Sequence, residues 1–255
     1  MRIIFLLLVA SVLAGAQKPA LQKDRQVLKD FRKDTVVAPR NIPLATQRTV
    51  LSKVFRRYLT DESKCSSDFD MTNGPDPLAA ARKAGQIVPS IIDSVTGSFT
   101  GAGESQTAYV IFVAECHASH ADNFGTKRVA IFQGPRLIAD LDVDFKRDIV
   151  RKTDLNSDGV DELLMTSGDM NQGTVIEMAA LVSFESGRFR VLHDFGTVVE
   201  DNCASGRPDS TSTASVLYIS DVIPGNMPKL TMENYESGCG QRKRWRLVST
   251  GKRQD

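Results

Sequence analysis

The spacing of apolar residues divides the chain into a helical part, over residues 17–95, and a β part, over residues 96–255. In "TQRTVLSKVFRRYL" the apolar residues recur on one face of a helix, and the same holds from Pro77 to about Ile92. Pro89 is expected to kink or divide this second helix. A weaker helix is predicted over residues 21–31, and the turn-rich "TDESKCSSDFDMTNGPDP" indicates a loop. The sequence therefore predicts an α-helical N-terminal segment.

From about Gly97 the period of the pattern changes to two. Short runs rich in β-branched and aromatic residues are broken by Gly, Pro, Asn and Asp: "TAYVIFVAEC", "KRVAIF", "RLIADL", "ALVSF", "RFRVLHDF", "ASVLYIS" and "RWRLVST". We therefore predict a mainly β fold in which the strands are mainly antiparallel.

The β part shows an internal repeat. "SFTGAGESQ", which starts at Ser98, aligns with "DLNSDGVDE", which starts at Asp154, and an apolar strand follows each. A third, more degraded copy starts at Asp221. The alignment predicts three antiparallel units of about fifty residues, each a small sheet that must stack on its neighbours to bury its apolar face.

The N-terminus has the three parts of a secretory signal peptide. Met1 and Arg2 precede the apolar run "IIFLLLVASVL" and the small residues "AGA", which predicts a signal peptide over residues 1–16 and a mature chain that begins near Gln17. The apolar run is too short to span a bilayer, so no transmembrane anchor is expected after cleavage. We expect the protein to be secreted or periplasmic. The net charge of +1 implies neither a nucleic-acid partner nor a membrane surface.

Four cysteines remain in a chain that is expected to be exported, where disulfides persist. None lies in a CxxC pair, so a cysteine zinc site has little support. Four cysteines allow three pairings, and the sequence alone does not choose among them. Proximity along the chain favours Cys203 with Cys239 and Cys65 with Cys116.

The segment "TDLNSDGVDELLM" is the main candidate for binding chemistry. Ca²⁺ takes six to eight oxygen ligands, and alternate residues of a tight loop can supply them. The ligands predicted on this basis are the side chains of Asp154, Asn156, Asp158 and Glu162 and the carbonyl group of Val160. Gly159 permits the left-handed turn around the ion, and Asp161 is expected to point outward. An EF-hand is excluded because its twelfth position is Met165 and the residues that follow are typical of a strand.

This loop resembles the D-x-D-x-D-G-x-x-D loop of FG-GAP and VCBS repeats, the blades of integrin-alpha-type β-propellers. The resemblance implies a calcium loop between two strands, with Asn156 and Glu162 as variants. Three units do not close a propeller of the usual blade count, so a partial, propeller-like arrangement is expected. The alternative is a plain turn in which Asp and Asn bind the backbone, although four oxygen-bearing residues exceed what a turn needs. No ion is expected in the other two loops: Ser98, Thr100, Ala102 and Gln106 carry no carboxylate, and only Asp221 remains in the third copy.

Other candidate residues favour structural interpretations. Glu115, His117 and His120 lack further metal ligands nearby, so solvated histidines in a loop are favoured over a zinc site. His193 and Asp194 are strand neighbours and are expected to face opposite sides. In "QRKRWRL" the basic residues could attract a polyanion or a sugar acid, but they are more typical of a charged edge strand.

These observations predict a secreted, non-enzymatic calcium-binding β-repeat module that binds a glycan, an envelope component or a protein. None of the common catalytic or nucleotide-binding motifs is present. One alternative is an envelope hydrolase with loop-borne catalytic residues, of which Glu115, His117 and His120 are the first candidates. Another is a purely structural envelope protein.

Overall fold

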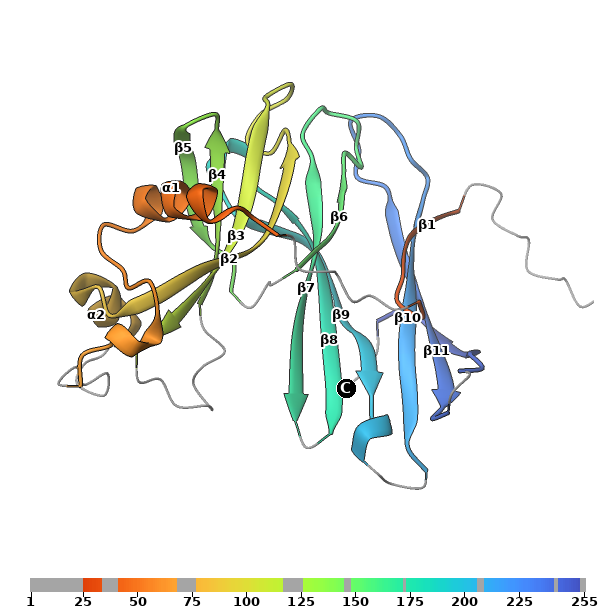
Figure 1. The fold of residues 1–255 in the computed structure, drawn as a ribbon. Helices are drawn as coiled ribbons and strands as arrows, with labels where there is room; N and C mark the ends of the chain where they lie inside the picture. Colours follow the sequence, from red (N-terminus) through yellow and green to blue (C-terminus); the bar gives the residue numbers. More distant parts are fainter. Residues whose placement is uncertain are drawn as a thin grey trace, which may run out of the picture.

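The fold is mainly β, as predicted, and consists of two antiparallel sheets (Figure 1). The computed structural model describes residues 25–33, 41–67, 77–116, 126–144, 148–171, 173–205, 209–240 and 243–252. The signal peptide predicted over residues 1–16 lies outside these residues. Within the described part of the chain, none of the helices is long and apolar enough to cross a membrane.

The smaller sheet has four strands in the order β2-β3-β4-β5. Their bounds are β2 (Ile87–Gly97), β3 (Gln106–Glu115), β4 (Thr126–Gln133) and β5 (Arg136–Asp142). Helices α1 (Leu44–Val54) and α2 (Pro77–Ala84) pack against one face of it. Helix α1 contributes the buried Val50 and Leu51, which confirms the helix face predicted there. Buried residues of this layer include Ala81, Ile91, Ile111, Val113 and Phe132.

The larger sheet has eight strands and curls into a half-barrel. Its strands are β6 (Asp148–Thr153), β7 (Glu162–Asn171), β8 (Thr174–Ser183), β9 (Arg190–Asp201), β10 (Thr211–Ser220), β11 (Lys229–Gly238), β12 (Arg246–Thr250) and β1 (Gln26–Asp30). Strand β11 pairs with the whole length of β10. On the other edge of β10, β9 pairs only with residues 212–214 and β1 pairs with residues 216–219. The half-barrel is therefore completed by a strand from the opposite end of the chain.

Strands β7 and β8 bury both of their faces. Leu163 and Met165 of β7 pack into the core between the two sheets, whereas Leu164 packs into the interior of the half-barrel. Residues 179–182 of β8 alternate in the same way. Full burial of a leucine stabilises the fold by about 1.5–3 kcal/mol. The two strands thus join the two cores and position the loop that precedes β7.

Two segments predicted to be helical are strands in the structure, whereas Pro77–Ala84, the first part of the helix predicted up to Ile92, is helical. Residues 87–92 belong to β2, whose side chains alternate between buried and half-buried positions, and Gln26–Asp30 form β1. The boundary predicted at residues 95/96 consequently falls inside β2. Pro89 is accommodated because β2 lies at the edge of its sheet, where one side of the strand needs no ladder hydrogen bonds. Tertiary pairing with β3 decides the conformation of this segment.

The predicted repeat appears in the loops more clearly than in the sheets. Each of three eight-residue loops, over residues 98–105, 154–161 and 221–228, joins two neighbouring strands. The expectation of three separate stacked sheets is wrong, because only the first unit forms a sheet of its own. The strands of the second and third units merge, since Asp201 of β9 pairs with Ser212 of β10.

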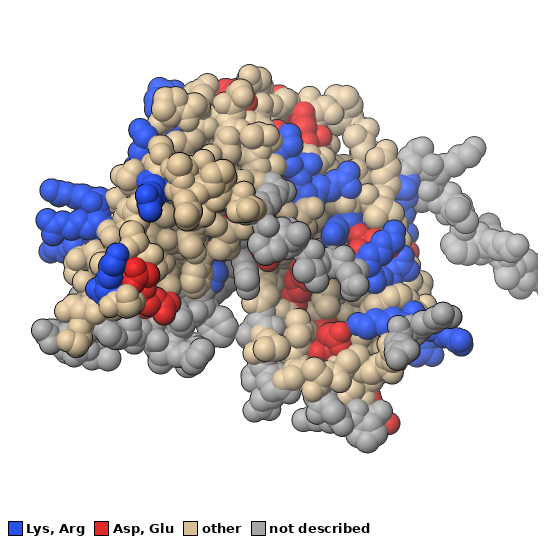
Figure 2. All heavy atoms as spheres, viewed as in Figure 1, with Lys and Arg blue, Asp and Glu red and all other residues tan. Residues whose placement is uncertain are grey.

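Charged side chains of both signs lie on the molecular face shown in Figure 2. Small groups of Lys and Arg lie next to groups of Asp and Glu, and uncharged residues cover most of the upper part of this view. This mixture agrees with the net charge of +1.

Candidate functional site

The 154–161 loop lies between the other two loops at the upper end of the molecule in Figure 1. The Asp161 N–H donates to the carbonyl oxygen of Ser98 in the first loop, at 2.6 Å. On the other side, the Gly225 N–H of the third loop donates to the carbonyl oxygen of Asn156, also at 2.6 Å. The three loops therefore form one hydrogen-bonded cluster with the acidic loop at its centre.

Hydrogen bonds to side-chain oxygens determine the backbone path of the acidic loop. The Asp154 carboxylate accepts the N–H groups of Asp158, at 3.1 Å, and of Gly159, at 3.0 Å. The Asn156 carboxamide accepts from the Asp158 N–H at 3.2 Å and donates to the Asp158 carboxylate at 2.7 Å. The Asp158 carboxylate also accepts the Val160 N–H at 2.8 Å. These contacts draw the side chains of the first, third and fifth positions toward the inside of the turn.

Glu162, the first residue of β7, is the buried member of the predicted ligand set. Its side chain is only 3 % exposed, and one carboxylate oxygen accepts the Leu155 N–H at 2.9 Å. Burial, together with the nearby negative charges of Asp158 and Asp154, raises the pKa of Glu162 to about 7, against the opposing effect of the Leu155 N–H. The site thus holds a carboxylate whose charge is poorly compensated by the protein alone.

The first loop contains the same hydrogen bond with an uncharged acceptor. The Gln106 side-chain oxygen accepts the Phe99 N–H at 2.9 Å, as Glu162 accepts from Leu155. Phe99 and Leu155 are both buried, at 0 % and 3 % exposure. The polar residue at position nine therefore fixes the backbone at position two and directs an apolar side chain into the core.

In the third loop, the equivalent positions are Val222, which is 45 % exposed, and Lys229, which has no acceptor atom in its side chain. Gln106 lacks a carboxylate, and this feature alone does not reveal its structural role. The signal that could have revealed its role is the pairing of an apolar residue at position two with a hydrogen-bond acceptor at position nine.

Asp161 does not point outward as expected. Its carboxylate accepts the Ser98 N–H at 2.8 Å and pairs with the Lys152 ammonium at 3.1 Å, and its side chain is 15 % exposed. The reason is the neighbouring loop, which brings a backbone donor to this side chain. Asp161 therefore connects the first two loops and is not a solvated residue.

The donor atoms of the acidic loop are of the type that Ca²⁺ prefers, because carboxylate, carboxamide and carbonyl oxygens are hard ligands. Asp154, Asn156, Asp158 and Glu162 are brought together by the contacts above, and Val160 lies in the same turn. Even so, among the described residues the three carboxylates do not form a group whose ligand atoms all lie within 4.8 Å of one another. Binding an ion would therefore require the carboxylates to move inward.

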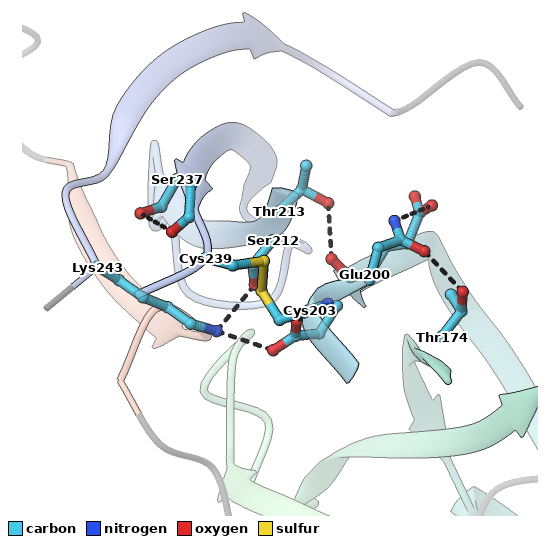
Figure 3. Close-up of a disulfide and its surroundings, with 11 residues drawn as sticks. Thr174, Glu200, Cys203, Ser212, Thr213, Ser237, Cys239 and Lys243 are labelled. Carbon is cyan, nitrogen blue, oxygen red and sulfur yellow. Dashed lines mark hydrogen bonds and ion pairs between the residues drawn. A yellow bond between two sulfur atoms is a disulfide. The ribbon is translucent and has the colours of Figure 1, made fainter. Parts of the chain in front are cut away.

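The cluster that does satisfy this spacing consists of Asp201, Cys203 and Cys239. It is not a metal site, because the two sulfur atoms form a disulfide, at 2.03 Å, and are not thiolates (Figure 3). Asp201 instead pairs with the Lys243 ammonium at 2.9 Å, and Lys243 also donates to the Ser212 hydroxyl. The second disulfide joins Cys65 to Cys116, so both favoured pairings are confirmed.

The remaining candidates are only partly described. Glu115 ends β3, and burial raises its pKa above the usual value. His117 and His120 lie outside the described residues. Of the basic C-terminal segment, only Arg246 and Leu247 lie in an edge strand, β12. Trp245 precedes this strand and packs against the core of the half-barrel.

His193 and Asp194 pair in register with Leu181 and Ala180 of β8. The register between β8 and β9 shifts between Leu181 and Val182 and again between Ala179 and Ala180. Both His193 and Asp194 line one cavity.

Comparison of the chain with protein-family models, curated proteins and solved structures returns no match. The resemblance of the acidic loop to FG-GAP and VCBS repeats therefore rests on the residues of the loop.

Proposed function

We propose that this protein is an exported, non-enzymatic β-repeat module in which Ca²⁺ binds the 154–162 loop and stabilises the cluster of three loops. The observation that carries the proposal is the burial of Glu162 beside Asp154 and Asp158. A divalent cation would compensate this charge, with Asp154, Asn156, Asp158 and Glu162 as side-chain ligands and Val160 as a carbonyl ligand. The role of the ion would be structural.

Export is supported by two features. The sequence begins with the three parts of a signal peptide, and the described residues contain two disulfides, which persist in oxidising compartments. In such a compartment, millimolar calcium is enough for a site with a dissociation constant of about 10⁻⁴ to 10⁻³ M, the order found in extracellular modules. A glycan or an envelope protein is the class of partner that fits an exported module of this kind.

Thermal melting with calcium and with chelator tests the ion site. Calcium at ten times its dissociation constant should stabilise the protein by about 1.4 kcal/mol, which raises the melting temperature by a few degrees. Asp154→Ala and Asp158→Ala should abolish this increment. Asp154→Asn removes the charge but keeps an oxygen that can accept the backbone N–H groups. It therefore distinguishes the effect of losing the charge from the effect of losing the turn. A melting temperature that millimolar calcium leaves unchanged would refute the site.

Asp221→Asn is the matched control for these variants. It removes the same charge at the first position of the third loop, where no ion is expected, so it should leave the calcium increment intact. Loss of the increment in this variant would show that calcium does not act through the 154–162 loop.

A further inference from the structure

Strands of the half-barrel line a cavity of about 450 Å³, which lies within the range of small-molecule sites. Strand β9 lines one side of it with His193, Asp194 and Phe195, and β11 lines the other with residues 230–233. Arg25 and the residues that follow β12 complete the lining. Because β10 exchanges its partner from β9 to β1 halfway along its length, the sheet leaves room at this point for a cavity.

Two ion pairs border this cavity. The Lys252 ammonium lies 3.1 Å from the Asp194 carboxylate. The Arg25 guanidinium lies 2.7 Å from the Glu233 carboxylate and stacks on the ring of Tyr218 at 3.3 Å. The charges are balanced, with two cationic and two anionic side chains. An anionic ligand would be attracted by one member of each pair and repelled by the other.

The rest of the lining is apolar or uncharged. Phe195 and Met232 are buried, at 2 % and 4 % exposure, and belong to the core of the half-barrel. The His193 ring packs edge-on against Phe195 with centroids 4.5 Å apart. Partial burial lowers the pKa of His193, and the opposing effect of Asp194 is countered in part by Lys252. Thr231 and Thr250 add hydroxyl groups.

We infer that this cavity binds a neutral sugar. Each hydroxyl group of a sugar both donates and accepts hydrogen bonds, so it can contact both members of an ion pair. Hydrogen bonds to charged groups are the stronger class, and the partly buried Leu230 of the lining can pack against the carbon face of a sugar ring. This inference rests on the proposed function only in treating the protein as a binding module, and it requires no calcium.

Nuclear magnetic resonance of the His193 imidazole tests the inference directly. The chain has three histidines, and the signal that disappears in His193→Gln identifies the one in the cavity. The probes are glucose and N-acetylglucosamine, with glucuronate as the acidic counterpart of glucose. We expect a saturable shift of the His193 signal with at least one neutral sugar at millimolar concentration and weaker binding of glucuronate. No saturable shift with either neutral sugar, or tighter binding of glucuronate, would overturn the inference.

Variants of the ion pairs locate the binding. Asp194→Asn and Glu233→Gln should each lower the affinity for the sugar at least several-fold, as measured by the His193 signal. Asp201→Asn breaks a comparable ion pair, with Lys243, outside the cavity lining. This variant should bind the sugar with the same affinity as the unaltered protein. Equal affinity in all three variants would place the binding elsewhere and overturn the inference. The titrations are run in chelator, so failure here is independent of the calcium melting experiment.

Discussion

Replacement of Glu162 by Gln should make the calcium-free protein more stable at neutral and alkaline pH. The Glu162 carboxyl is buried, and its pKa in the folded protein is about 7 against an ordinary value of 4.5. Gln106 occupies the equivalent position in the first loop and accepts the same backbone N–H through a carboxamide oxygen. The substitution therefore preserves the hydrogen bond to Leu155 and removes the charge.

The magnitude follows from the difference between the two pKa values. Because the pKa of Glu162 is higher in the folded state, its contribution to stability is fully present below pH 4.5 and is lost as the pH rises to about 7. At 1.36 kcal/mol per pKa unit, this loss is about 3 kcal/mol. Glu162→Gln has no titrating group at this position. Its free energy of unfolding should therefore exceed that of the unaltered protein by up to about 3 kcal/mol at pH 8, and it should lack this part of the pH dependence.

Urea denaturation between pH 4.5 and 8, in the presence of chelator, measures how the free energy of unfolding changes with pH in Glu162→Gln and in the unaltered protein. Glu236→Gln is a suitable control, because Glu236 is 37 % exposed and makes only a 3.5 Å pair with Arg246, so this substitution should leave the slope unchanged. Calcium should restore stability to the unaltered protein at pH 8 and have less effect on Glu162→Gln. Equal pH slopes for Glu162→Gln and the unaltered protein would refute the reasoning.

Substitutions at the Cys203–Cys239 disulfide and at two loop glycines test other parts of the structure. Replacement of Cys203 and Cys239 by Ser opens a link across a sequence separation of 36 residues and should cost about 4 kcal/mol in urea denaturation; an unchanged midpoint would contradict this expectation. Gly159→Ala places a Cβ atom 2.9 Å from that of Ala102, at a residue with φ 85°. A left-handed backbone alone costs an alanine roughly 1–2 kcal/mol, so this substitution should lower the stability by more than that amount. Gly103→Ala, with φ 72° and open space around its new Cβ, isolates that backbone cost, and equal losses would show that the contact with Ala102 is relieved.

The strands of the β part could be predicted because their side chains alternate between a buried and an exposed or second buried face. The joining of β9 to β10 could not, because hydrogen bonds between backbones leave no trace in the side-chain pattern. Residues 87–92 show the same limit, since Ile87 and Ile91 fit both one helix face and the inner face of a strand. Pairing with β3 decides between these possibilities, and its partners lie twenty or more residues further along the chain.

The acidic loop was predictable as a turn with converging oxygens, because Gly159 and the alternating acidic residues are local signals. The inward contacts of Asp161 were not, because its partner Ser98 belongs to another unit. The cavity lined by strands of the half-barrel was also not predictable. Its lining comes from β9, β11, the chain after β12 and Arg25, and these segments meet only when the sheet curls.

The pairing of β1 with β10 places a constraint on how the chain folds. Gln26 pairs with Ile219, and Leu28 is 1 % exposed in the core of the half-barrel. Strand β1 is thus synthesised before the other strands but cannot pair with β10 until almost the whole chain has left the ribosome. Contacts this distant in sequence form slowly, so the half-barrel closes late.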